Sequence, residues 1–266
     1  MRREDLLKHN RAAWNHSVNS NVRWTQIAGP DLIDRARSGD VEIILTPQKK
    51  VPASWLPPLA GRRVMGLAAG GGQQGPVLAA AGALVTIVDL SPLQLQQDNK
   101  AAEQYGLNIQ CIEASADDLT GIPDSSQDLI VHPVSNCFFP QLESVWRECY
   151  RVLKPDRELI AGINNPVAYL FDYEKSNRGE FVLKYAQPFS DIESFTSEEK
   201  ARFLRPESPL EFGHSLESQL GQLMRQGFVL LDLYEDYWGD ANERPIDRYF
   251  PQFIAFRAKK QKPSGT

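Results

Sequence analysis

The chain has 266 residues, a length that favours one large domain with an added segment over two full domains. Its 29 basic and 34 acidic residues give a formal net charge of −5, and Lys and Arg occur at most in pairs, which argues against a nucleic-acid backbone or an anionic membrane as partner. Hydrophobic residues make up 42% of the chain, enough for a sizeable core, but the most apolar stretch, residues 77–88, is too short to span a bilayer.

The cysteines, the histidines and the start of the chain narrow the class further. Cys111, Cys137 and Cys149 have no CxxC spacing, which argues against a disulfide framework and against a zinc site. Four scattered histidines form no HExxH motif, so we expect no metal. The charged start is not followed by an apolar segment with a small-residue cleavage site, so we expect a cytoplasmic protein.

Residues 1–58 precede the first expected strand. Residues 1 to about 45 favour helices, and Pro30 and Asp31 mark the start of the second one. A proline-rich connector follows, formed by Pro47, Pro52, Pro57 and Pro58, in which neither a helix nor a central strand continues easily. We therefore expect an N-terminal helical cap and connector over residues 1–58.

An alternation of strands and helices then predicts the main fold. Apolar runs at residues 64–68 and 85–88 flank a small-residue helix near 77–81, which is a βαβ unit. The pattern continues with a helix over 92–105, strands at 109–112 and 128–131, a helix over 142–153 and a strand at 158–161. Continuous apolar strands separated by helices predict an α/β protein with a parallel, doubly wound, Rossmann-like sheet covered on both faces.

The alternation breaks after residue 163. Residues 164–213 carry many aromatic and polar residues with weak strand alternation, and long irregular segments in compact domains are often functional. We therefore expect a lid or substrate insertion over 164–213. A helix over 216–226 and strands at 228–233 and 253–256 complete the core, which comprises residues 59–163 and 214–260.

A glycine turn joins the first strand to the first helix of the core. Gly70, Gly71 and Gly72 let backbone N–H groups approach a ligand closely, and the start of the helix favours a negative group there. Asp89 ends the second strand, where its carboxylate can accept hydrogen bonds from both hydroxyls of a ribose. Strand, turn, helix, strand and acid together predict a cofactor that contains a nucleoside.

The glycines alone leave the identity of this cofactor open. Residues 70–75 satisfy the GxGxxG pattern, and Tyr150 and Lys154 match the YxxxK pair of short-chain dehydrogenases. Against an NAD(P)-dependent oxidoreductase of that type, Pro155 would end the helix where this pair needs it to continue. That oxidoreductase stays an alternative, as does a protein that binds the cofactor without catalysis.

Several segments between residues 64 and 162 form a recognisable series. The glycine turn Val64-Met65-Gly66-Leu67-Ala68-Ala69-Gly70-Gly71-Gly72 is followed by Val88-Asp89-Leu90-Ser91, by Glu113-Ala114-Ser115-Ala116-Asp117-Asp118-Leu119, and by the more specific Ser126-Gln127-Asp128-Leu129-Ile130 and Tyr150-Arg151-Val152-Leu153-Lys154-Pro155. In these segments the chain resembles a class I S-adenosylmethionine-dependent methyltransferase, of the small-molecule group similar to ubiquinone- and menaquinone-biosynthesis enzymes. The resemblance implies S-adenosylmethionine as cofactor and a seven-stranded sheet whose last strand is antiparallel, here with a cap insertion between strands five and six.

Two departures from that family concern the cofactor site. Gly66 stands where the family has an acid that helps to hold the methionine ammonium, and Ala68 replaces the first glycine. We therefore assign the ammonium to backbone carbonyls around His132, with help from Asn136. Ser115 stands where an acid would accept from the adenine amino group, with Asp117 as a nearby substitute. The expected cofactor-binding residues are Gly66, Ala68, Gly70, Gly72, Gln73, Asp89, Leu90, Ser115, Ala116, Asp117, His132 and Asn136.

Methyl transfer from a sulfonium is a direct displacement, in which the protein aligns the acceptor, excludes water and, where needed, removes a proton. His132 and His214 are the candidate bases, although each can equally be a hydrogen-bonded structural residue. The expected substrate residues at the start of the insertion are Asn164, Tyr169, Phe171 and Tyr173, with a turn or ordinary core packing as the alternative. The expected activity is methyl transfer to a small-molecule acceptor; the acceptor and the oligomeric state stay open.

Overall fold

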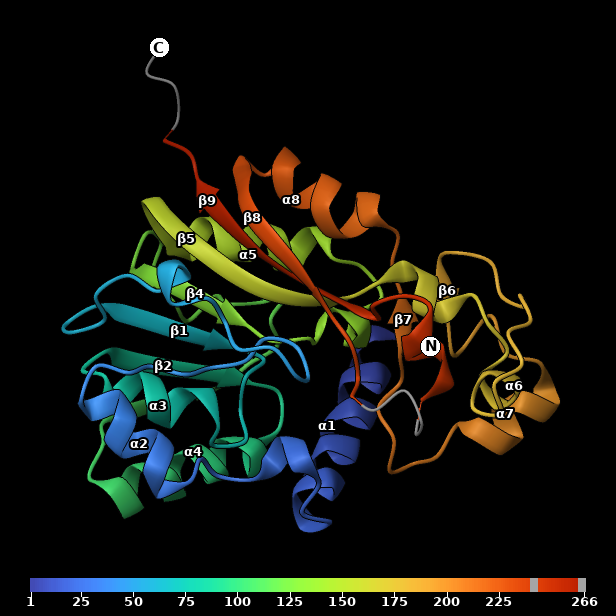
Figure 1. Cartoon of the computed structure of the whole chain (residues 1–266), viewed down its shortest axis with the longest axis horizontal. Helices are drawn as coiled ribbons and strands as arrows, with labels where there is room; N and C mark the ends of the chain where they lie inside the picture. Colours follow the sequence, from blue (N-terminus) through green and yellow to red (C-terminus); the bar gives the residue numbers. More distant parts are fainter. Residues whose placement is uncertain (240–243, 263–266) are drawn as a thin grey trace.

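The structure is a computed structural model that describes residues 1–239 and 244–262. At its centre is a seven-stranded sheet in the order β3-β2-β1-β4-β5-β9-β8 (Figure 1). The parallel strands are β1 (Arg63–Leu67), β2 (Leu84–Asp89), β3 (Ile109–Glu113), β4 (Gln127–His132) and β5 (Leu153–Asn164). The last strand, β9 (Phe253–Lys260), runs antiparallel to β5 and to β8 (Phe228–Asp236). The expected α/β fold, with an antiparallel last strand, is confirmed.

Each face of the sheet has its own apolar core. Along β4, Leu129 and Val131 belong to one buried cluster and Ile130 to the other, which explains why the strand is apolar without alternation. One cluster lies under α5 (Glu143–Val152) and α8 (Gln222–Arg225), and the other under α2 (Pro30–Arg37), α3 (Gln74–Ala80) and α4 (Pro92–Tyr105). Figure 1 shows these two groups of helices on opposite sides of the sheet.

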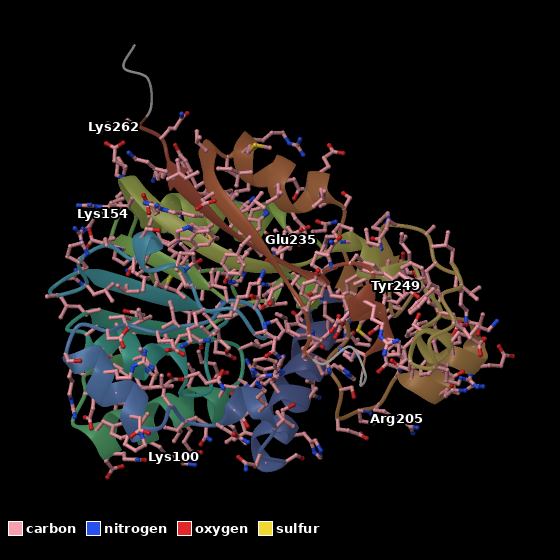
Figure 2. The ribbon with its side chains drawn as sticks, viewed as in Figure 1. Lys100, Lys154, Arg205, Glu235, Tyr249 and Lys262 are labelled. Carbon is pink, nitrogen blue, oxygen red and sulfur yellow. The ribbon has the colours of Figure 1, made fainter. Side chains whose placement is uncertain are left out.

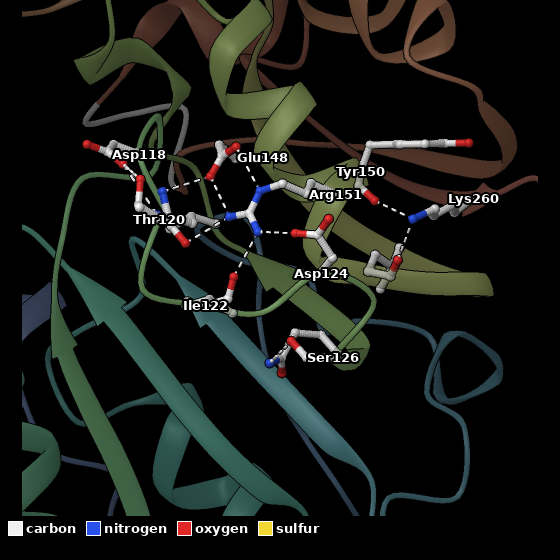
Figure 3. A network of polar contacts seen from close by, with 12 residues as sticks. Asp118, Thr120, Ile122, Asp124, Ser126, Glu148, Tyr150, Arg151 and Lys260 are labelled. Atoms are coloured by element: carbon white, nitrogen blue, oxygen red, sulfur yellow. Dashed lines mark hydrogen bonds and ion pairs between the residues drawn. The ribbon is translucent and has the colours of Figure 1, made fainter.

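Arg151 lies in the sequence segment at residues 150–155, and its contacts give this residue a structural role (Figure 3). Its guanidinium donates to the backbone oxygens of Leu119 and Ile122, each at 2.8 Å, and pairs with Glu148 at 2.7 Å and Asp124 at 2.6 Å. The loop after β3 is thereby fastened to α5.

Lys154 connects the two most specific segments to each other. Its ammonium lies 2.9 Å from Oδ1 of Asp128 at the start of β4, and Oδ2 of Asp128 accepts a hydrogen bond of 3.0 Å from the backbone N–H of Arg63. The expected helix over 142–153 ends at Val152, and β5 starts at Leu153, earlier than expected, since Leu153 pairs with Gln127. The segment is therefore a helix-to-strand corner.

The N-terminal segment wraps around the core. Helices α1 (Arg3–Asn19) and α2 confirm the expected helical character, and an irregular connector follows as far as β1. Trp55 in the connector is buried, and its indole N–H donates to Asp232 of β8 at 3.0 Å. Asp236, at the end of β8, accepts from the backbone N–H groups of Gln48 and Lys49 at 2.8 and 2.9 Å. The connector is thus tied to the far edge of the sheet.

The insertion, residues 164–213, contains α6 (Tyr173–Ser176), α7 (Ser197–Phe203) and a separate two-stranded sheet of β6 (Phe189–Ser190) and β7 (Phe212–Gly213). Figure 1 shows these elements beyond the carboxyl ends of β1 and β4. Leu6 of α1 joins Leu210 and Phe212 in a small apolar cluster of their own. None of the helices in the described part of the chain has the length and apolar character needed to cross a membrane.

Candidate functional site

A cavity of about 510 Å³ lies at the carboxyl ends of the parallel strands, where ligands bind in doubly wound sheets. Its volume falls in the usual range for small-molecule sites. The sheet contributes the segments after β1 to β4 and Asn164 at the end of β5. The remaining wall comes from three other parts of the chain. The N-terminal segment contributes Leu7, Asn10, Trp14, Trp24 and Ile44 to Pro47, and the insertion contributes Ala168, Tyr169, Tyr173, Pro209 and Glu211. The part from the end of β8 to the start of β9 contributes Trp238, Arg244, Gln252 and Phe253.

The glycine turn lies close to β2 and α4 because Gly70 has no side chain. A Cβ at Gly70 would lie 2.8 Å from Cβ of Gln94 and 3.0 Å from Oδ2 of Asp89. Ala68, which replaces the first glycine of the family pattern, has a φ of 46°, in the left-handed region that disfavours residues with a Cβ. The backbone thus keeps the turn geometry at position 68 although the glycine is missing.

Asp98 of α4 binds the backbone of the glycine turn, a role that was not predicted from the sequence. Its Oδ2 accepts from the backbone N–H groups of Gly71 and Gly72 at 3.0 and 3.1 Å, and the side chain is fully buried. Burial raises the pKa of Asp98 to about 7. The available signal was its spacing from Leu95 and Ala101, which places this lone acid on the buried face of the helix.

The position of Asp98 bears on which cofactor the turn can accept. In a dinucleotide site the free N–H groups of such a turn hold an anionic diphosphate. Here the N–H groups of Gly71 and Gly72 already bind a carboxylate, and a second carboxylate, Asp89, is close enough to raise the pKa of Asp98 further. These two N–H groups are therefore not free to hold a diphosphate, which argues against the NAD(P) alternative.

Asp89 lies in the cavity wall at the end of β2. Its Oδ2 accepts from the N–H of Gly70 at 3.0 Å and its Oδ1 from the N–H of Ser91 at 2.9 Å. Burial raises the pKa of Asp89 to about 6. Each carboxylate oxygen has further lone pairs, so the fixed carboxylate can accept from two adjacent hydroxyl groups.

Six of the twelve expected cofactor residues line the cavity, and six do not. The cavity wall includes Ala68, Gly70, Gln73, Asp89, Leu90 and Ala116, whereas Gly66, Gly72, Ser115, Asp117, His132 and Asn136 lie outside it. A Cβ at Gly66 would come within 2.5 Å of Ile87 Cδ1, so core packing occupies the place of the family's acid. Arg3 binds both oxygens of Asp117, at 2.8 and 3.0 Å, which competes with an adenine amino group for that carboxylate.

The two histidines support the site from outside the cavity and do not face it. His132 is fully buried, with Nδ1 at 2.8 Å from the carbonyl oxygen of Leu67 and Nε2 at 2.9 Å from the Asn136 amide. Both partners are oxygens, a backbone carbonyl and Oδ1 of Asn136, so each ring nitrogen faces a hydrogen-bond acceptor; burial lowers the pKa of His132, and the two hydrogen bonds oppose that shift. Nε2 of His214 lies 2.8 Å from the carbonyl oxygen of Phe139. Neither residue lines the cavity, so this geometry gives no support to the expected catalytic role.

Three of the four expected substrate residues meet at the insertion end of the cavity. Asn164, Tyr169 and Tyr173 line it, whereas Phe171 stacks on Phe250 at a ring distance of 5.9 Å outside the wall. Glu211 joins them, since Tyr169 donates a hydrogen bond of 2.9 Å to its Oε2. Sequence reasoning missed Glu211 because it lies 42 positions after Tyr169, too far along the chain for a local pattern to connect the two.

The N-terminal helix connects both ends of the cavity. Arg11 of α1 donates to the carbonyl oxygen of Leu90 at 3.2 Å, beside Asp89, and Trp14 packs edge-on against Phe138 at a ring distance of 5.2 Å. In the described part of the chain, no group of three or more His, Cys, Asp or Glu side chains is arranged to hold a metal ion. The cavity thus has one end at Asp89 and an insertion end at Glu211.

Comparisons with known proteins agree with this geometry. Residues 65–161 match the family described as "Methyltransferase domain". The chain is 42% identical over 255 residues to the uncharacterized methyltransferase YbaJ of Bacillus subtilis, covering 96% of this chain and 98% of that protein. It is 30% identical over 115 residues to a ubiquinone biosynthesis O-methyltransferase of Pseudomonas savastanoi pv. phaseolicola, covering 42% of this chain and 50% of that protein.

Two solved structures show the same fold at low sequence identity. A putative S-adenosylmethionine-dependent methyltransferase from Listeria monocytogenes is similar with a TM-score of 0.61 and 15% identity, covering 79% of this chain and 94% of that one. The 1,6-didemethyltoxoflavin-N1-methyltransferase of Burkholderia thailandensis, solved with bound 1,6-didemethyltoxoflavin and S-adenosylhomocysteine, is similar with a TM-score of 0.58 and 12% identity, covering 98% of this chain and 92% of that one. Because the relationship to the Bacillus protein extends over nearly the whole chain, the chain belongs to the methyltransferase family, as an enzyme whose cofactor is S-adenosylmethionine.

Proposed function

We propose that this enzyme transfers the methyl group of S-adenosylmethionine to a small molecule held at the insertion end of the cavity. The observation that carries the proposal is the continuity of one cavity of about 510 Å³, whose wall includes Asp89 and Gly70 at one end and Asn164, Tyr169 and Glu211 at the other. Such a cavity accommodates a cofactor and a small acceptor side by side.

The residues of the wall suit the cofactor. Asp89 is placed to accept from the two ribose hydroxyls, with Ala68, Gly70, Leu90 and Ala116 around the nucleoside. The side-chain N–H₂ of Gln73 is bound to the carbonyl oxygen of Arg23 at 2.8 Å, so its amide oxygen is the group that it offers to the methionine ammonium. This oxygen binds the ammonium in place of the family's acid, whose position Gly66 occupies.

When bound, S-adenosylmethionine supplies an activated methyl group, so the chain has to orient the acceptor and keep water out. Apolar walls for this purpose come from Trp14 and Trp24 of the N-terminal segment, from Trp238 after β8 and from Phe253 at the start of β9. Asn164 and Tyr169 provide polar groups that orient the acceptor against these walls. Enclosure by four separate parts of the chain favours a small acceptor over a segment of a macromolecule.

Two further observations support a small acceptor. The formal charge is −5, which does not favour a nucleic acid as acceptor, and Figure 2 shows the labelled Lys100, Lys154 and Arg205 far apart on the outline of the molecule. The structurally similar Burkholderia enzyme is described with a small molecule bound beside S-adenosylhomocysteine.

The proposal is tested by a metabolite screen in which S-adenosylhomocysteine release is measured for the purified full chain. Fractions of cell extract below and above a molecular-weight cut-off are compared. We expect turnover with the small-molecule fraction, because the cavity encloses its ligand. Turnover only with the macromolecular fraction would refute a small acceptor while leaving the methyltransferase assignment intact.

A further inference from the structure

The insertion end of the cavity contains an acid for which the displacement described above has no use. We propose that Glu211 is the catalytic base of this enzyme, which accepts the proton of a ring-bound O–H or N–H group of a planar aromatic acceptor. Tyr169 and Asn164 act as its positioning residues. This inference rests on the proposed function and names the class of acceptor for the same site.

The hydrogen bonds of Glu211 hold its carboxylate in place at the cavity wall. Oε2 accepts from the hydroxyl of Tyr169 at 2.9 Å, and that hydroxyl accepts in turn from the side-chain amide of Asn164. The backbone of Glu211 is fixed as well, since it donates to the Asp191 carboxylate at 2.8 Å and accepts from the Asp191 N–H at 3.1 Å. With Oε2 committed to Tyr169, Oε1 is the oxygen left for a ligand.

The fold makes specific room for Tyr169. A Cβ at Gly213 of β7 would lie 2.7 Å from Cγ of Tyr169 and 2.9 Å from Cβ of Phe189. The ring of Tyr169 therefore lies directly on the glycine and stacks on Phe189 at a ring distance of 5.3 Å. Glycine at position 213 is what allows the Tyr169 hydroxyl to reach Glu211.

The charged and titratable groups around Glu211 come from several elements. They are Asp191 beside β6, Tyr169 and Cys137, which carry no charge at neutral pH, and Arg244 before β9. Burial raises the pKa of Glu211, while the bond from Tyr169 and the charge of Arg244 oppose that rise. A carboxylate with a raised pKa is a stronger base than an ordinary one yet stays ionised above that value.

The walls next to this acid are aromatic. Phe138, Phe139, Trp14 and Tyr173 line the cavity, and Trp238 packs edge-on against Phe253 at 5.2 Å with Arg244 above its ring at 4.5 Å. Flat aromatic surfaces around one hydrogen-bond acceptor fit a planar ring that carries a single donor.

In the proposed step, a lone pair of the ring oxygen or nitrogen forms the bond to the methyl carbon as the carbon–sulfur bond breaks. The electron pair of the broken bond stays on sulfur. The proton of the O–H or N–H passes to Oε1 of Glu211 and later to solvent. A base is required because a neutral acceptor would otherwise carry a positive charge after methylation.

The test uses pairs of probes that differ only in the proton to be removed. 2-Naphthol is compared with 2-methoxynaphthalene for O–H, and indole with 1-methylindole for N–H, by titration into the full chain saturated with S-adenosylhomocysteine. For at least one pair we expect the wild type to bind the proton-bearing probe about tenfold more tightly or better, as for a hydrogen bond to a charged group. Glu211→Gln should lower that preference to about twofold and leave the affinity for S-adenosylhomocysteine unchanged.

Two controls make the result specific to the acid. Glu193→Gln, an exposed acid of the same insertion, should keep the full preference. The preference of the wild type should fall as the pH is lowered through the raised pKa of Glu211, whereas that of Glu211→Gln should not change with pH. No preference for either pair in a wild-type complex that holds S-adenosylhomocysteine, or a preference that survives in Glu211→Gln, would overturn the inference. Failure of the wild type to hold S-adenosylhomocysteine would instead count against the proposed function.

Discussion

The side-chain oxygen of Asn10 accepts a hydrogen bond of 2.9 Å from the backbone N–H of Leu210, 200 positions later in the chain. The bond joins α1 to the end of the insertion, where Leu6 packs on Leu210 and Phe212. Both segments line the cavity. The bond therefore joins two segments of the cavity wall.

Asn10→Ala tests this junction. The substitution leaves the buried N–H of Leu210 without its acceptor, which costs about 1–3 kcal/mol of the free energy of unfolding. We expect faster hydrogen exchange in α1 and in residues 204–213, and weaker protection of both when S-adenosylhomocysteine binds. Lys8→Ala, an exposed change on the same helix, is the control. Unaltered exchange in Asn10→Ala would show that the two segments do not depend on this contact.

Asp98 gives a prediction that depends on pH. Asn at position 98 can still accept from Gly71 and Gly72 through its amide oxygen, whereas Ala cannot. Near about pH 4, where the acid is protonated in the folded state, Asp98→Ala should therefore lose about 2–4 kcal/mol of the free energy of unfolding, since two buried N–H groups lose their partner. Asp98→Asn should be close to the wild type at that pH.

The direction of the pH effect follows from the pKa of Asp98, about 7 in the folded chain against 3.8 for an ordinary aspartate. The folded state holds the proton more tightly, so this group stabilises the fold at low pH, and that contribution is lost as the pH rises through about 7. Relative to the wild type, Asp98→Asn should gain about 1–3 kcal/mol between about pH 4 and pH 8. Denaturant unfolding at several pH values measures this difference, and a constant difference would contradict it.

Asp89 should control the affinity for the cofactor. Asp89→Asn keeps the shape of the side chain but loses the charge that strengthens its hydrogen bonds to hydroxyl groups, so we expect about tenfold weaker S-adenosylmethionine binding or worse. Because the pKa of Asp89 is about 6, binding by the wild type should weaken as the pH falls below that value, and binding by Asp89→Asn should not. Calorimetric titration measures both effects, with Asp31→Asn on the surface as control. Equal affinities would remove Asp89 from the cofactor site.

Gly213→Ala and Gly121→Ala form a matched pair. A Cβ at position 213 meets the Tyr169 ring at 2.7 Å, whereas nothing lies within 4 Å of one at position 121. We expect Gly213→Ala to lose about 1–3 kcal/mol of the free energy of unfolding through overpacking, and Gly121→Ala to lose little. Thermal and denaturant unfolding decide between them. A Gly213→Ala variant as stable as the wild type would show that Tyr169 can move aside.

His132 should matter for stability and not for proton transfer. His132→Ala removes a buried ring that bonds to Leu67 and Asn136, so we expect a loss of about 2–4 kcal/mol of the free energy of unfolding. Burial lowers the pKa of His132, so its contribution is lost as the pH falls below the ordinary value of 6.5. The stability difference between wild type and variant should therefore shrink in acid. A fully stable variant with slow methyl transfer would restore His132 as a catalytic residue.

The sequence by itself determined the sheet and the end of the cavity that contains Gly70 and Asp89. Continuous apolar runs such as Leu129 to Val131 arise because both faces of a parallel strand are buried, and this property is visible in a few adjacent residues. Gly70 and Asp89 belong to one βαβ unit, so short-range spacing alone brings them together, and Gly70 donates to Asp89 at 3.0 Å.

Only the tertiary structure decided what faces the cavity. Glu211 reaches Tyr169 through the pairing of β6 with β7, and Asp98 reaches the glycine turn through the packing of α4, contacts that no local pattern encodes. His132 follows a strand whose end opens toward the ligand, yet its ring turns into the core because Leu67 and Asn136 satisfy both of its nitrogens there. Side-chain direction at a strand end depends on the hydrogen-bond partners that the folded chain offers, and these come from residues distant in sequence.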